Sequence, residues 1–359
     1  MGRRRLIWHI GLADPARDVV GANLAAHGPA LEAAGLLVVG DPRTATLATH
    51  ELLRTHRRAG LSRKDVEGQW ARICDRVWQH RGVSLLSTPG LCAADKDHLR
   101  LALDPLIGLE VHLVVTADTW SQQLYGAWLA ELRAGRTTAW DTYVARVLAR
   151  VTDDGAQRHR QAEEFWAGHE LASILARWGW TFHADRLHVV PGSTPAAQWA
   201  TFLEVAGVAA AEQLAPVVPP YADPAGVAVL RKVNRQLDDG SASASTDLLT
   251  RADEEQAAMP VADTVPLTPL LERWRGAFAA TGYDVRGDLA ALLDKGGPTP
   301  LPGPRDQLGI AVAALAQALS ENAQLRDRVA TLEDDNARLD RKRRKHKRRA
   351  RRLEAVGEN

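Results

Sequence analysis

The chain has 359 residues, of which 45% are hydrophobic and 25% charged, so it can bury one large core or two smaller ones. Its two cysteines, Cys74 and Cys92, exclude a disulfide framework and a four-cysteine zinc site, and they fit a reducing compartment. No segment approaches the roughly 18 apolar residues that a membrane span needs, so we expect no transmembrane segment.

The net charge of +1 conceals two parts of opposite sign. Residues 341–352, RKRRKHKRRARR, contain ten Lys or Arg and no acid, and without those ten the net charge falls from +1 to −9. The chain therefore combines an acidic body with a strongly basic tail, and the two parts need not share one function.

The amino-terminal stretch MGRRRLIWHIGLADP resembles a secretory signal only in outline. Its apolar run is short, contains His9 and leads into Asp14-Pro15 without a small-residue cleavage site. We interpret it as the first strand of the domain. The expected location is therefore cytoplasmic, and association with a membrane surface is left open.

Short apolar segments alternate with amphipathic segments through the first half of the chain, which predicts an α/β domain with a mainly parallel central sheet flanked by helices. The predicted strands are residues 5–12, 36–39, 83–87, 111–116 and 187–190. The predicted helices are residues 15–34, 63–80, 120–133, 137–151, 156–178, 194–206 and 224–237. Because such sheets bind ligands at the carboxyl ends of their strands, residues 11–18, 87–90 and 117–121 should lie along one rim.

The rest of the chain divides into segments of different composition. The α/β domain is expected to cover residues 1–293, with 238–268 as a flexible, linker-like insertion and 269–293 as a closing helical segment. A Gly/Pro-rich linker at 294–306 separates it from a long C-terminal helix. That helix holds a predicted coiled coil at 307–340 and the basic tail at 341–359.

Several segments resemble a known family in the same order along the chain. They include IWHIGLADPARDVVGANLAAHGPALEAAGLLVVGD, VHLVVTADTWSQQLYGAW, RLHVVPGSTPAAQWATFLEVAG and LLERWRGAFAATGYDVRGDL. Together they resemble the bacterial sulfotransferase-like proteins, which have a P-loop-type fold and use the sulfate donor PAPS. The resemblance covers about residues 5–293 and implies this fold for the domain.

The resemblance also implies where a donor site would lie. Family members hold the phosphosulfate in a Pro-Lys-x-Gly-Thr-Thr loop after the first strand, and the 3′-phosphate with an Arg and a Ser. A polar catalytic group can follow a further strand, here at residues 87–89. In this sequence the lysine, the glycine, the two threonines, the arginine and the serine correspond to Asp14, Ala16, Arg17, Asp18, Asp118 and Gly126. Every phosphate-binding position that aligns is therefore replaced.

These replacements oppose binding of an anion. PAPS carries about four negative charges, because each phosphate group holds roughly one and a half to two. Two like charges ~4 Å apart at an effective dielectric of ~20 repel by about 4 kcal/mol, and Asp14 and Asp118 both have the unfavourable sign. We therefore expect no cofactor, with PAPS as the donor only if the chain is an active sulfotransferase.

Asp14 has a second interpretation. Asp is a preferred N-cap and Pro a preferred first helical residue, so Asp14-Pro15 could close a helix end that the family closes with a bound phosphate. The alternative is an anion site rebuilt around Arg17.

His9 and the tryptophans each have two interpretations. His9, on a buried strand, is either a hydrogen-bonded core histidine or a general base. The eleven tryptophans are interpreted as packing residues in preference to a sugar-binding platform. Cys92 and His98 are too isolated to indicate a metal site, so none is expected.

A heptad pattern over residues 308–342 predicts a parallel, two-stranded coiled coil and hence a homodimer. The a positions are Leu315, Asn322, Val329 and Asn336, and the d positions are Ala318, Leu325, Leu332 and Leu339. Paired Asn residues would fix the register, and Glu321 would face Arg326 of the second chain. The alternative is a single solvated helix that packs on the body.

The tail continues the same helical phase as an almost unbroken run of cations. In a dimer it would bind a polyanion, such as nucleic acid, acidic lipid or anionic glycan. The expected contacts are Arg341, Lys342, Arg343, Arg344, Lys345, Lys347, Arg348, Arg349, Arg351 and Arg352. A tail that only keeps the protein soluble is the alternative.

Three functions follow from these patterns. The first is a sulfotransferase-like protein with a degenerate donor site that works as a dimeric binding or scaffold protein. The second is an active sulfotransferase that modifies a glycan or a small-molecule hydroxyl. The third is a tether to a polyanion or a membrane surface through the tail. The missing phosphate-binding residues favour the first.

Overall fold

The computed structural model describes residues 4–12, 17–153, 155, 157–180, 182–192, 194–208, 214–237, 249, 259–295 and 297–357, with only the backbone for residues 345 and 347–357. Six strands form one sheet in the order β2-β3-β1-β4-β5-β6, and all the pairings are parallel. The strands are β1 (Arg5–His9), β2 (Leu37–Val38), β3 (Val83–Ser87), β4 (Glu110–Ala117), β5 (Leu187–Pro191) and β6 (Asp284–Val285). The α/β class predicted from the sequence is confirmed.

The central strands are apolar on both faces because helices cover the sheet on both sides. Ile7 of β1 packs in a cluster with α1 (Val19–Ala33) and α10 (Pro195–Ala206) on one face. Leu6 and Trp8 belong to the larger cluster on the other face. That cluster draws on α2 (Pro42–Leu52), α4 (Gln69–Gln79), α5 (Lys96–Leu103), α6 (Trp120–Arg133), α7 (Trp140–Thr152), α8 (Arg160–His169), α9 (Leu171–Gly179), α11 (Pro224–Asn234) and α13 (Thr268–Thr281).

Tryptophan side chains fill much of the larger cluster. Trp8 stacks on Trp70 with ring centroids 5.1 Å apart and meets Trp178 edge-on at 5.3 Å. The ring centroids of Trp120 and Trp274 are 5.4 Å apart. The interpretation of most tryptophans as packing residues is confirmed.

Three predicted helices differ from the observed helices by more than a few residues at one end or by a division. The helix expected over 15–34 is α1, which begins at Val19 with Asp18 as its N-cap, so Asp14 does not cap it. The helix expected over 63–80 is divided into α3 (Arg63–Val66) and α4, because Gly68 adopts a left-handed conformation with φ of 79°. The helix expected over 156–178 ends at His169, and Glu170 then caps α9 through the Ser173 N–H.

Two segments differ from their predicted secondary structure or packing. The closing segment, expected to be helical over 269–293, contains α13 and then β6, which pairs with β5 at the edge of the sheet. In the expected loose insertion, residues 259–268 pack on the body: the Ala262 N–H donates to Ser121 Oγ at 2.8 Å, and Leu267 is buried. Residues 238–248 and 250–258 of that insertion lie outside the described residues.

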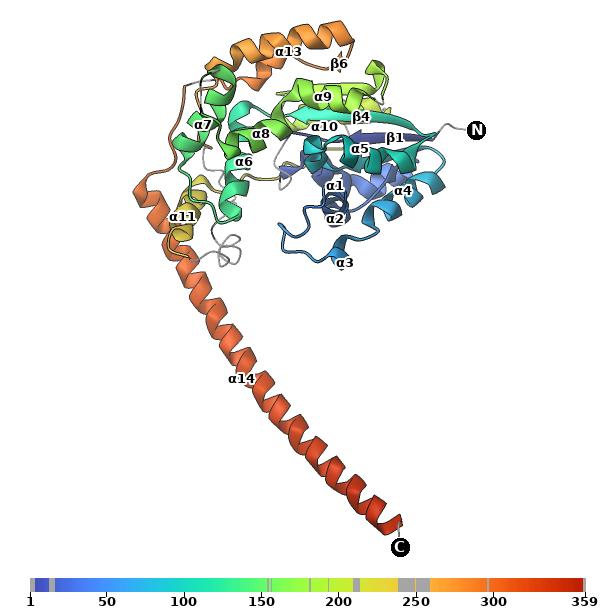
Figure 1. Cartoon of the computed structure of the whole chain (residues 1–359), viewed down its shortest axis with the longest axis vertical. Helices are drawn as coiled ribbons and strands as arrows, with labels where there is room; N and C mark the ends of the chain where they lie inside the picture. The colour runs from blue at the N-terminus through green and yellow to red at the C-terminus, as the bar shows by residue number, and fades with distance from the viewer. Residues whose placement is uncertain are drawn as a thin grey trace.

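The C-terminal helix α14 (Pro304–Gly357) is continuous through 54 residues. Ile310, Ala311 and Ala314 in its first turns pack against the core, where α14 contacts α11. The helix then leaves the body as a rod that ends far from the sheet (Figure 1). Because it begins at Pro304, the predicted linker over 294–306 extends three residues too far. No helix within the described residues has the length and apolarity required to cross a membrane.

Candidate functional site

The site lies where β1, β2 and β3 end and α1 and α2 begin. Asp18 follows the loop after β1 and caps α1: its Oδ1 accepts the Gly21 N–H at 2.9 Å. Its Oδ2 accepts the hydroxyl of Ser87, the last residue of β3, at 2.6 Å. A carboxylate thus satisfies the helix end at which a P-loop-type site would place a phosphate.

The Ser87 hydroxyl belongs to a chain of hydrogen bonds that crosses three strands. His9 lies 2.7 Å through Nδ1 from Ser87 Oγ and 2.8 Å through Nε2 from Thr116 Oγ1. Ser87 donates to the Asp18 carboxylate, so it must accept from the Nδ1–H of His9, and Nε2 must then accept from Thr116. Every group in the chain has a partner, which makes His9 a hydrogen-bonded core residue.

Burial lowers the pKa of His9 below its ordinary value, and the nearby Asp18 carboxylate only partly opposes this effect. The ring is therefore neutral near pH 7. It supplies no positive charge to the site, although its Nδ1 lies 3.5 Å from Asp18 Oδ1.

Glycines at two positions make this arrangement possible. A Cβ on Gly11 would lie 2.6 Å from Thr116 Oγ1 and 2.7 Å from His9 Nε2. A Cβ on Gly21 would lie 2.2 Å from Asp18 Oδ2. Both glycines therefore make room for the hydrogen-bonded side chains.

Arg17 is the cation nearest to this carboxylate along the chain, and it is directed to other partners. Its Nη1 lies 3.6 Å from Asp118 Oδ2, and both side chains are almost completely buried. Its Nε donates to the Pro219 carbonyl at 3.1 Å, and its guanidinium lies 3.6 Å from the centre of the Tyr221 ring. Three contacts, with a carboxylate, a carbonyl and an aromatic face, hold the guanidinium inside the protein.

Asp118 follows β4 and is held from several sides. Its carboxylate accepts the Gln198 side-chain amide at 2.5 Å, and its backbone carbonyl accepts that of Gln123 at 2.6 Å. Burial raises the pKa of Asp118, while Arg17 and Gln198 act to lower it. Burial thus has the largest effect on this carboxylate, and the ion pair with Arg17 favours its charged form.

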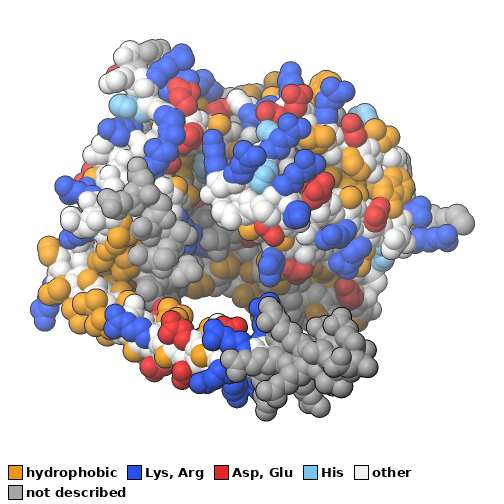
Figure 2. All heavy atoms as spheres, turned by 60° about the horizontal axis from the view of Figure 1, so that its bottom comes forward, with side chains coloured by type: hydrophobic (Ala, Val, Ile, Leu, Met, Phe, Trp, Pro, Cys, Tyr) orange, Lys and Arg blue, Asp and Glu red, His pale blue; other side chains and the backbone are white. Residues whose placement is uncertain are grey.

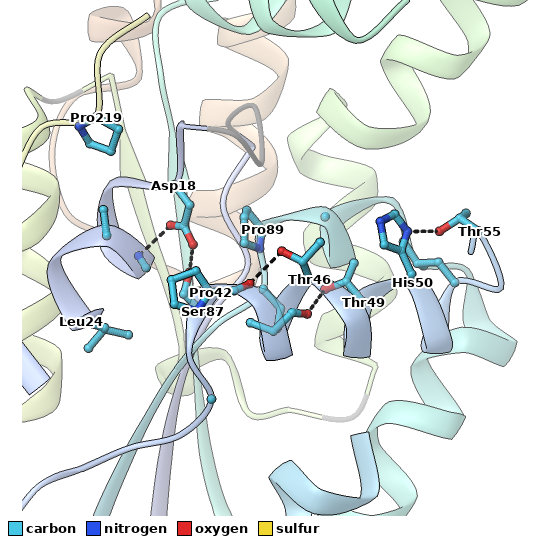
Figure 3. A pocket seen from close by; sticks show the side chains of 17 residues that line it. Asp18, Leu24, Pro42, Thr46, Thr49, His50, Thr55, Ser87, Pro89 and Pro219 are labelled. Carbon is cyan, nitrogen blue, oxygen red and sulfur yellow. Dashed lines mark hydrogen bonds between the residues drawn. The ribbon is translucent and has the colours of Figure 1, made fainter. Parts of the chain in front are cut away.

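A cavity of about 380 Å³ opens beside Asp18, between α1, α2 and the residues that follow β3 (Figure 3). Its volume is in the range of small-molecule sites. Its walls are mainly apolar, with Leu24, Pro42 and Pro89 among them, and Thr46 and Thr49 bond through their hydroxyls to carbonyls of α2 itself.

Asp18 is the one fully charged side chain among the described residues that line the cavity. His50, at the far end, bonds to Thr55 Oγ1 at 2.8 Å, and burial lowers the pKa of its ring, so it is neutral near pH 7. Arg17 does not line the cavity. The cavity therefore combines apolar walls with a single negative charge.

The structure brings together some of the residues that aligned with the donor site. Arg17, Asp18 and Asp118 lie on one rim, whereas Gly126 is buried within α6. Asp14 lies outside the described residues. Sequence reasoning missed the partners of Arg17 and Asp118, namely Gln123, Gln198, Pro219 and Tyr221, because nothing in their own segments marks them.

Metal and thiol chemistry find no support in this part of the structure. Within the described ranges no group of three or more His, Cys, Asp or Glu is arranged to hold a metal ion. Cys74 and Cys92 are free and buried, and burial raises the pKa of each thiol to about 12. Both are therefore poor nucleophiles near neutral pH.

The predicted coiled-coil positions lie on the exposed part of α14. Leu315, Leu325, Val329, Leu332 and Leu339 are more than half exposed, and apolar side chains alternate with charged ones along the rod (Figure 2). Asn322 and Asn336 are also exposed, whereas Ala318 is half-buried. Of the tail cations, Arg341, Lys342, Arg343 and Arg344 are exposed, and the other side chains lie outside the described set.

Comparison with known proteins gives one structural similarity. No family model matches the chain, and no curated protein matches it. A sulfotransferase from Alicyclobacillus acidocaldarius is similar over 82% of this chain and 98% of its own, with 13% sequence identity and a TM-score of 0.36. No activity follows from a similarity of this size.

Proposed function

We propose that the protein is a non-catalytic, dimeric binding or scaffold protein whose body lacks a functional donor site for sulfuryl transfer. The observation that carries this proposal is the position of the Arg17 side chain. This side chain is buried against Asp118 and Tyr221, so the loop after β1 directs no described cation toward the cavity.

The chemistry of sulfuryl transfer supports the same conclusion. Transfer from a phosphosulfate requires positive charge where negative charge develops on the leaving phosphate. At this position the structure has the Asp18 carboxylate, which already occupies the Gly21 N–H and the Ser87 hydroxyl. A phosphate would have to displace a group of its own sign.

The proposed dimer rests on α14. An isolated helix gains little from a row of exposed leucines, whereas two such helices bury them against each other. The seam would begin after the turns that contain Ala311 and Ala314, because those residues already pack on the body. From residue 319 to residue 344 every described side chain is exposed, so this length of helix is open to a partner.

Calorimetric titration of the full chain with adenosine 3′,5′-bisphosphate, the product left by a PAPS-dependent transfer, tests the loss of the donor site. We expect no saturable binding, meaning a Kd weaker than about 1 mM, or less than about 4 kcal/mol of binding free energy.

Two variants make the result specific. Arg17→Met removes the buried guanidinium, and Arg150→Met removes an exposed one that pairs with Glu163 far from the site. Micromolar binding by the unmodified chain would overturn the proposal. If that binding were lost in Arg17→Met and kept in Arg150→Met, the donor site would be one rebuilt around Arg17.

A further inference from the structure

The cavity beside Asp18 has a definite chemical character that the absence of a donor site does not explain. It is large enough for a small organic molecule, and its walls are mostly apolar. A cavity of this kind favours an occupant that is apolar over most of its surface and polar at one point.

The Asp18 carboxylate defines that point. Of the roughly four acceptor positions on its two oxygens, the structure uses one for the Gly21 N–H and one for the Ser87 hydroxyl. The side chain is 16% exposed and lines the cavity, so acceptor capacity remains on that side. These remaining positions can accept a hydrogen bond from an occupant.

The sign of the charge at this point is set by the neighbours of Asp18. The positive end of α1 offsets about half of the carboxylate charge. His9 is neutral because it is buried, and Arg17 is compensated by Asp118. A partial negative charge therefore remains, and it faces apolar walls that strengthen its attraction for a cation.

We propose that this cavity binds a small organic cation, an apolar molecule with one ammonium group that donates to the Asp18 carboxylate. The apolar part would lie along Leu24, Pro42 and Pro89 (Figure 3). Carboxylate–ammonium hydrogen bonds are stronger than those between neutral groups, so the ammonium fixes the orientation and the walls supply affinity. This inference rests on the proposed loss of the donor site, since a bound phosphosulfate would require the opposite charge.

Calorimetry of the full chain with two matched series of probes tests the inference. The first series is benzylamine, phenethylamine and 4-phenylbutylamine, and the second consists of the corresponding alcohols. We expect at least one amine to bind at least ten-fold more tightly than its alcohol at pH 7.

Asp18→Asn removes the charge and keeps the N-cap, because the Asn Oδ1 can still accept from the Gly21 N–H. The Asn Nδ2 takes the place of the second oxygen and donates to Ser87 Oγ, whose hydroxyl can then donate to Nδ1 of His9 in its other neutral tautomer. We expect this variant to lose the preference for the amine while its affinity for the alcohol stays within about two-fold. Asp41→Asn is the matched control: Asp41 caps α2 beside the cavity but does not line it, so the preference should persist.

Three results would overturn the inference. They are equal binding of amines and alcohols, failure of the amine series to bind, and equal losses in Asp18→Asn and Asp41→Asn. None of these would restore the donor site, which the nucleotide titration measures separately. A chain that bound neither amine nor nucleotide would keep the proposed function and refute only this inference.

Discussion

At the scale of single residues, the site is dominated by carboxylates that satisfy the protein's own donors. Asp18 takes the N–H of Gly21 and the hydroxyl of Ser87, and Asp118 takes the charge of Arg17. In each case a group that could have bound an external anion is paired internally. Arg17 and Asp18 are thus held in place without a ligand.

The Arg17–Asp118 pair gives a prediction about stability. Removing one partner of a buried ion pair leaves the other charge without compensation, which typically costs roughly 3–5 kcal/mol. We expect a loss of this size in urea unfolding for both Arg17→Met and Asp118→Leu, measured at one protein concentration. The double variant should lose at least about 2 kcal/mol less than the sum of the two single losses, because neither charge remains.

The same pair predicts a dependence on pH. Burial already raises the pKa of Asp118, and Arg17→Met removes the guanidinium that opposes this effect, so the folded state of the variant holds the proton more tightly than the unfolded state. The loss of stability in Arg17→Met should therefore shrink as the pH falls from 7 toward 4. A constant loss over this range, or strictly additive losses in the double variant, would show that Arg17 and Asp118 act independently.

The residues of the site were only partly visible in the sequence. His9, Arg17, Asp18, Ser87 and Asp118 follow strands or end them, and the rule for parallel sheets places them on one rim. The N-cap was assigned to Asp14 because Pro15 follows it, yet the chain turns into the helix only after Asp18. Local preference alone did not distinguish two aspartates four residues apart.

At the scale of elements, the long strands and the helices with a clear apolar face were predicted closely. β3 and α6 have the predicted bounds, and α10 begins one residue after its predicted start. β6 was missed because a two-residue strand has no periodicity, and only its pairing with β5 identifies it. The division after His169 was missed because Glu170, a good helix former, ends one helix and caps the next, where it also bonds to Trp274.

The exposed apolar row of α14 gives a prediction about assembly. Leu325→Lys with Leu332→Lys places two cations in the predicted seam, and we expect this variant to be a monomer at a micromolar concentration at which the unmodified chain forms the proposed dimer. Sedimentation equilibrium measures the change. Ala323→Lys with Ala330→Lys adds the same charge at exposed positions outside the seam and should leave the dimer intact. A monomeric unmodified chain, or equal behaviour of both variants, would support the single solvated helix.

At the scale of the whole molecule, the charges are separated along α14. The acidic body lies at one end of the rod, and the cations from Arg341 onward lie toward the other (Figure 1). A parallel dimer would place both bodies together and both tails together. This arrangement concentrates positive charge away from the rest of the chain, which has a net negative charge.

This separation predicts salt-dependent binding of a polyanion. We expect the full chain to bind a short DNA duplex. The logarithm of the association constant should fall linearly with the logarithm of the salt concentration, with a slope of about 0.9 for each phosphate contact. Replacing Arg341, Lys342, Arg343 and Arg344 with Gln should reduce this slope, as measured by fluorescence anisotropy.

The matched control replaces four exposed arginines of the body, Arg57, Arg58, Arg63 and Arg72, with Gln. This variant has the same net charge as the tail variant and should keep the slope of the unmodified chain. Equal slopes in both variants, or no binding at low salt, would leave the tail with a solubilising role only.

The anchoring of α14 has a mechanical consequence. The helix is about 80 Å long, and the residues of it that pack on the described part of the core lie in its first three turns or so, through Ala314. The helix is therefore anchored near one end, like a cantilever. A sideways force on its far end produces a large bending moment at the small contact with α11. A second helix wound around the first would make the rod stiffer and would divide the bending moment between two such contacts. A protein tethered by its tail would then hold its body at a nearly fixed height above the surface.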